Sequence, residues 1–118
     1  MRHLLALSCP PTAVFCFNDV TAMGVLRGLD AAGVRVPHDC SVIGFDDLDM
    51  AAYYCPPLTT VRQPSYRLGR RAMRMLEMLI QGEEDVQAKV LPADLIVRQT
   101  TGPVPAPARE GRGEVMGP

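Results

Sequence analysis

The sequence has almost no net charge, and this excludes several functions. Twelve basic and 13 acidic residues give a formal net charge of -1 over 118 residues. Such a balance leaves no basic surface for nucleic acid or for an anionic membrane. Long apolar runs are also missing, so no segment is predicted to span a bilayer. The run from Leu4 to Leu7 is too short for the core of a signal peptide, and we expect the end of a helix there.

Cysteine pairs with metal-binding spacing are missing as well. The four cysteines, at positions 9, 16, 40 and 55, contain no C-x-x-C pair, which argues against a zinc site. Cys16 and Cys40 fall in or beside apolar runs, where a reduced thiol acts as a small hydrophobic side chain. We therefore expect reduced, structural cysteines, as is typical of a cytoplasmic protein. We expect neither a metal nor a cofactor.

One stretch organises the chain, and it reads PTAVFCFNDVTAMGVLRGLDAAGVRVPHDCSVIGFDD. Its apolar runs, 13–17 and 41–45, each predict a strand, and apolar residues recur at helical spacing between them. The residues of this helical face are Ala22, Val25, Leu26, Leu29 and Ala32. Gly33 and then Pro37 predict that the helix has ended. Strand, helix and strand in this length predict a parallel crossover unit.

Both strand runs stop at polar residues, Asn18-Asp19 and Asp46-Asp47. If the strands are parallel, Asn18 and Asp46 lie at the same carboxyl edge of the sheet, where open α/β sheets bind ligands. Asn18 is also a favoured helix cap, so the positive end of the helix would face the same edge. From these residues alone, Asn18 could equally be only a cap, and the two acids only turn residues.

The rest of the chain continues the α/β pattern. We expect a short helix or turn over 48–54, a strand over 58–62 and a long helix from Pro64 to about Gln81. One or two short strands follow over 89–98, broken near Pro92. Pro, Gly, Ala and charged residues dominate from Gly102 onward, so 102–118 is predicted to be a disordered tail after a folded part, 1–101.

These segments together carry a family likeness. The stretch quoted above, then PPLTTVRQP, LGRRAMRMLEMLIQGE and VLPADLIVRQT, resembles the effector-binding domain of LacI/GalR-type transcriptional repressors. The resemblance covers roughly residues 4–101. It implies a partial type I periplasmic-binding-protein-like fold, with a parallel βαβ core and a long helix and C-terminal strands from the second lobe. It also implies that the helix-turn-helix headpiece and most of the N-terminal lobe are absent, because the chain matches about the last third of such a protein.

The resemblance further implies roles for particular residues. Asn18, Asp46 and Gln63 match positions that contact or border the effector, a small polar molecule such as a sugar. Met23 and Tyr54 match positions in a homodimer interface. DNA would be bound only through the absent headpiece, and no membrane partner is implied. For Asp47 we expect a structural role rather than ligand contact.

Other functions remain open at this point. Asp46 and Asp47 could form a general acid/base pair, but no nucleophile or second base stands near them in the sequence, so we expect no enzyme. A periplasmic sugar-binding protein would share the fold, and a truncated gene product would have no activity of its own. The apolar face Leu68, Ala72, Met75, Leu76 and Leu79 would pack on a sheet that this chain lacks. We therefore expect the chain alone to be marginally stable or self-associating.

Overall fold

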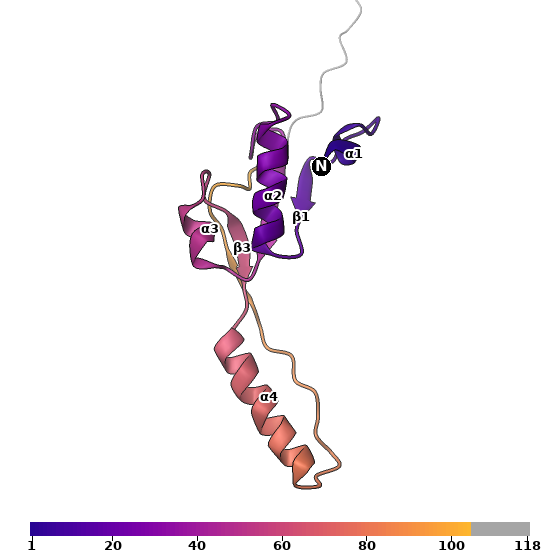
Figure 1. Cartoon of the computed structure of the whole chain (residues 1–118), viewed down its shortest axis with the longest axis vertical. Coiled ribbons are helices and arrows are strands. Elements are labelled where there is room, and N and C mark those ends of the chain that lie inside the picture. The colour runs from indigo at the N-terminus through magenta and orange to yellow at the C-terminus, as the bar shows by residue number, and fades with distance from the viewer. Residues whose placement is uncertain (105–118) are drawn as a thin grey trace, which may run out of the picture.

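A computed structural model describes residues 1–104 of the chain (Figure 1). Helices and strands alternate along these residues. In chain order they are α1 (Arg2–Leu5), β1 (Ala13–Phe15), α2 (Asp19–Asp30), β2 (Ser41–Phe45), α3 (Asp49–Tyr53), β3 (Thr59–Arg62), α4 (Ser65–Ile80) and β4 (Asp94–Ile96). The elements from β1 onward fall within predicted segments, and α1 overlaps the helix end expected over Leu4 to Leu7. The first and last strands are shorter than predicted. The first ends early because Asn18 already caps the next helix and Phe17 is exposed.

The strands form one sheet in the order β1-β2-β3-β4. β1 pairs with β2, and β2 with β3, in parallel, whereas β4 runs antiparallel to β3. The predicted parallel crossover unit is therefore confirmed, and with it the α/β fold class. Successive right-handed crossovers in one direction place their helices on the same face of a sheet.

The core lies between this face and helices α2 and α3. Leu29 of α2, Val42 of β2 and Ala51 of α3 are fully buried in one hydrophobic cluster. The helical face predicted from the sequence is the buried face of α2, where Leu26 is also buried. Gly33 follows the end of α2 with a φ of +71°. Glycine suits this position because it has no Cβ to clash in a left-handed conformation.

The opposite face of the sheet is open within the described residues. Phe15 of β1 is 66% exposed and Leu95 of β4 is 57% exposed. The Phe15 ring packs edge-to-face on Phe45, with ring centroids 6.5 Å apart. Parallel sheets normally carry helices on both faces. Within the described residues, one face of the sheet is therefore covered by helices and the other is uncovered.

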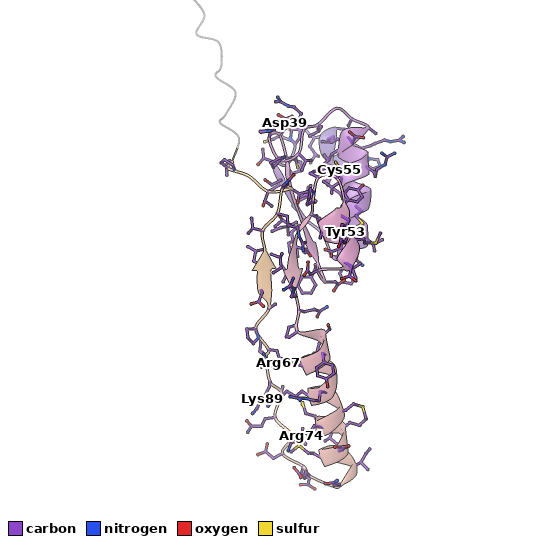
Figure 2. The ribbon with its side chains drawn as sticks, turned by 90° about the vertical axis from the view of Figure 1, so that its left-hand side faces the viewer. Asp39, Tyr53, Cys55, Arg67, Arg74 and Lys89 are labelled. Atoms are coloured by element: carbon purple, nitrogen blue, oxygen red, sulfur yellow. The ribbon has the colours of Figure 1, made fainter. Side chains whose placement is uncertain are left out.

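Helix α4 projects away from the sheet as an arm, together with the segment that returns to β4 (Figure 1). None of its residues is buried, and Leu68, Leu76 and Leu79 are about half exposed, at 48%, 47% and 55%. Its predicted apolar face is thus uncovered within residues 1–104, and the self-association expected from it stays a prediction. Figure 2 shows Arg67 and Arg74 on α4 with Lys89 on the returning segment.

The chain after β4 is hydrogen-bonded to the beginning of β2. The Val42 amide donates to the Thr100 carbonyl oxygen at 2.7 Å, and the Gly102 amide donates to Ser41 Oγ at 3.2 Å. The tail predicted over 102–118 falls almost entirely outside the described residues. No helix within 1–104 is long and apolar enough to cross a membrane.

Candidate functional site

Three polar side chains lie at the carboxyl edge of the parallel strands. Phe15 pairs with Ile43, and Asn18 and Asp46 each follow three residues later in their own chains. Gln63 comes directly after β3, at the same edge of the sheet. The parallel register thus brings Asn18, Asp46 and Gln63, which we call the rim, to one edge. This edge is where open α/β sheets bind ligands.

Asp46 and Gln63 contact each other directly. Gln63 Nε2 donates to Asp46 Oδ1 at 2.7 Å, and the Asp46 amide donates to the Val61 carbonyl oxygen at 2.9 Å. Within residues 1–104 the second carboxylate oxygen of Asp46 has no hydrogen-bond partner. Since an ionised carboxylate only accepts hydrogen bonds, this oxygen can accept a hydrogen bond from a ligand hydroxyl.

Asn18 acts as the predicted cap of α2. Its Oδ1 accepts a hydrogen bond from the Thr21 amide at 2.8 Å, and its backbone is extended, as a cap requires. The side-chain amide nitrogen has no partner within the described residues. A cap and a free donor are compatible roles, because the two ends of the amide group are used separately. The rim therefore offers both a donor and an acceptor to a polar ligand.

The rim is an open edge. The hollows of about 460, 580 and 1320 Å³ in the described residues are lined by other side chains. No three His, Cys, Asp or Glu residues within 1–104 come together in a way that could hold a metal ion. The rim thus presents two neutral amides and one carboxylate along an open edge of the sheet.

Asp19 is a buried residue whose role the sequence analysis missed. It is fully buried, its Oδ2 accepts from the Leu48 amide at 2.8 Å, and its Oδ1 accepts from Thr60 Oγ1. Its carboxylate therefore holds both the start of α3 and strand β3. The missed signal was its position on the helical wheel, since Asp19 falls three residues before Ala22 on the buried face. Gly44 leaves room for it, because a Cβ at that position would overlap Asp19 Oδ1.

Asp47 is paired with two arginines of this chain and is not open to a ligand. Its side chain is only 6% exposed, and it forms ion pairs with Arg62 at 2.6 Å and with Arg98 at 2.7 Å. Burial alone would raise the pKa of Asp47, but hydrogen bonds and attraction from Arg98 and Arg62 lower it below the ordinary value. Neither arginine was predicted from the sequence as a partner of Asp47.

Met23 and Tyr54 are joined by a hydrogen bond within this chain. Met23 is 9% exposed, and its carbonyl oxygen accepts a hydrogen bond from Tyr54 Oη at 3.3 Å. This bond joins α2 to the end of α3. The same two helices carry exposed apolar side chains, namely Val20 of α2 at 61%, and Met50 and Tyr53 of α3 at 56% and 88%.

Comparison with known proteins identifies the family to which this fold belongs. Residues 1–101 match the model of the periplasmic binding protein-like domain. The HTH-type transcriptional repressor CytR of Escherichia coli K12 is 43% identical over 106 residues, which are 89% of this chain and 31% of CytR. The chain belongs to the LacI/GalR family. It spans about a third of the length of this curated relative.

Solved structures of the LacI/GalR family share the fold. A LacI family regulator from Enterococcus faecalis V583 with bound ribose superimposes with a TM-score of 0.73 at 41% identity, over 86% of this chain and 38% of that one. The lac repressor dimer bound to operator and an anti-inducer gives a TM-score of 0.70 at 40% identity, over 77% of this chain and 32% of that one. The family likeness inferred from the sequence and the partial-domain fold are thus confirmed. These relatives are transcriptional regulators rather than enzymes, as expected.

Proposed function

We propose that this chain contributes one side of the effector site, and part of the dimer interface, to a LacI-type transcriptional regulator in the cytoplasm. The effector is a small polar molecule of the sugar class. DNA binding belongs to a helix-turn-helix headpiece that lies outside this sequence. The observation that carries the proposal is the rim, where Asn18, Asp46 and Gln63 follow three neighbouring strands at one edge.

The chemistry of the rim suits ligand hydroxyls. Asp46 holds one oxygen on Gln63 and leaves the other free within the described residues, and Asn18 has a free amide donor. A carboxylate accepts hydroxyl protons in charge-assisted hydrogen bonds, which are roughly twice as strong as neutral ones. The ribose held by the Enterococcus faecalis relative is a ligand of this class.

A second copy of the chain is the proposed partner of the α2–α3 surface. The hydrogen bond between Tyr54 and Met23 joins α2 to the end of α3. Val20 of α2 and Met50 and Tyr53 of α3 expose apolar side chains. The lac repressor relative is described as a dimer. In the proposed mechanism, the effector favours one of two arrangements of the dimer and thereby changes the spacing of the headpieces.

A titration of the ¹⁵N-labelled chain with ribose and other pentoses and hexoses tests the sensing role. We expect the signals of Asn18, Asp46 and Gln63 to move at millimolar sugar, because only one side of the site is present. Asp46→Asn should weaken binding by about 10- to 150-fold, since a hydrogen bond to a charged group contributes about 1.5–3 kcal/mol. Asp49→Asn is the matched control, because Asp49 is exposed in the first turn of α3.

Two results would reject the sensing role. One is a set of rim signals that no sugar moves. The other is an Asp46→Asn variant that binds sugar as tightly as the Asp49→Asn control while its spectrum stays folded.

A further inference from the structure

The turn after β2 contains two consecutive residues in a left-handed backbone conformation. Asp46 has a φ of +108° and Asp47 a φ of +55°. Residues other than glycine rarely adopt positive φ, because the Cβ atom then crowds the backbone. Such a conformation persists only where surrounding contacts hold it in place. The contacts of this turn therefore decide where the Asp46 carboxylate points.

Asp47 supplies the strongest of these contacts. Its Oδ2 accepts from Arg62 Nε at 2.6 Å, and its Oδ1 accepts from Arg98 Nη2 at 2.7 Å. Arg98 is itself fixed, because its Nη1 donates to the Leu58 carbonyl oxygen at 2.8 Å and its amide donates to Thr59 Oγ1 at 2.9 Å. A 6% exposed carboxylate held by two guanidinium groups has little freedom to rotate.

The two acids of the turn form hydrogen bonds with two consecutive residues at the end of β3. Asp47 pairs with Arg62, the last residue of β3, and Asp46 pairs with Gln63, the next residue. The turn is thus held at two adjacent points, and a rotation that breaks the first contact also moves the second. Arg98, from the segment after β4, fixes the turn from a further direction.

We propose that Asp47 is a positioning residue for the rim. Its simultaneous pairing with Arg62 and Arg98 holds the turn in the conformation that presents the Asp46 carboxylate to Gln63 and to the ligand. The part concerning the ligand rests on the proposed function.

The test compares Asp47→Asn with Asp49→Asn in the ¹⁵N-labelled full chain, without any ligand. Asparagine keeps the shape of Asp47 but removes the charge that holds two guanidinium groups. We expect the Gln63 side-chain amide signal to move toward its position in an unstructured peptide, and the Asp46 amide to exchange with solvent at least 10-fold faster. The Thr21 amide, which binds Asn18, should keep its signal and report an intact α2. Asp49→Asn should change none of these signals.

A merely structural role for Asp47 would give a different result. It would lower the melting temperature while the Gln63 signal and the Asp46 exchange rate stayed at wild-type values in the folded state, and this would overturn the proposal. If Asp47→Asn does not fold, Arg62→Gln replaces it, since the Arg62 side chain is 55% exposed. That variant should move the Gln63 signal in the same direction by a smaller amount, and an unmoved signal would again overturn the proposal.

The outcome is separable from that of the proposed function. Failure of sugar sensing appears as wild-type rim signals that ribose does not move. Failure of the positioning role appears as a Gln63 signal that Asp47→Asn does not move, whether or not ribose binds.

Discussion

Replacing Gly44 by alanine should severely destabilise the chain. A Cβ at this position would overlap Asp19 Oδ1, and it would come within 3.0 Å of Leu58 Cδ2 and 3.3 Å of the Asp19 Cα atom. Asp19 and Leu58 are both fully buried, so neither can yield toward solvent. The Asp19 carboxylate would have to leave its place, and its hydrogen bonds to the Leu48 amide and to Thr60 would be weakened or lost.

The magnitude follows from two contributions. Overpacking a well-packed interior costs about 1–3 kcal/mol. Losing one hydrogen bond of a buried charged group adds about 1.5–3 kcal/mol. We therefore expect the free energy of unfolding to fall by about 2.5–6 kcal/mol. Since about 1 kcal/mol shifts the melting temperature of a domain of roughly 100 residues by about 4–8 °C, the melting temperature should fall by at least about 10 °C.

Gly24→Ala is the matched control for this prediction. Gly24 lies in the middle of α2, and a Cβ there would have no other atom within 4 Å. Alanine in a helix interior is more favourable than glycine by about 0.5–1 kcal/mol, so this variant should be slightly stabilised. Urea unfolding followed by circular dichroism measures both variants. A Gly44→Ala variant as stable as wild type would refute the assignment of Asp19 as the buried link between α2, α3 and β3.

Two further predictions concern titratable groups. The contacts from Arg62 and Arg98 lower the pKa of Asp47, so the stability they contribute is present above the unfolded-state pKa and is lost as pH falls through the folded-state pKa. The stability difference between wild type and Asp47→Asn, measured by urea unfolding, should therefore be largest near pH 7 and shrink below about pH 4; a difference independent of pH would contradict this. Iodoacetamide should modify the exposed Cys9 and Cys55 quickly and Cys16 and Cys40 only after unfolding, because both are buried and burial raises the pKa of each thiol. Mass spectrometry reads out the four sites, and equal labelling of Cys16 in the folded chain would contradict the burial.

Local sequence signals were sufficient for the order and type of the elements. Helix α2 could be predicted because its apolar spacing, its Asn18 cap and its Gly33 end all agree, and each of these signals acts within a few residues. The parallel pairing of β1 and β2 followed from the helix between them, since strands joined by a crossover helix run the same way. The presence of Asn18 and Asp46 at one edge then followed from geometry.

Side-chain partners far apart in the sequence could not be predicted in this way. Asp47 meets Arg98 across 51 positions, and Asp19 meets Thr60 across 41 positions. No periodicity or spacing encodes such pairs. They arise because β3 lies beside β2 in the sheet and because the chain after β4 returns along β3.

The sequence by itself determined the elements, the parallel crossover and the family, because these depend on short-range chemistry and on residue order. Only the tertiary structure showed which side chains the two acids at the end of β2 bind. Asp46 turns toward Gln63 and the open edge, whereas Asp47 turns inward between two arginines. Neighbouring residues with the same side chain acquire different roles because the backbone at this turn, with φ positive at both, points them to different surroundings.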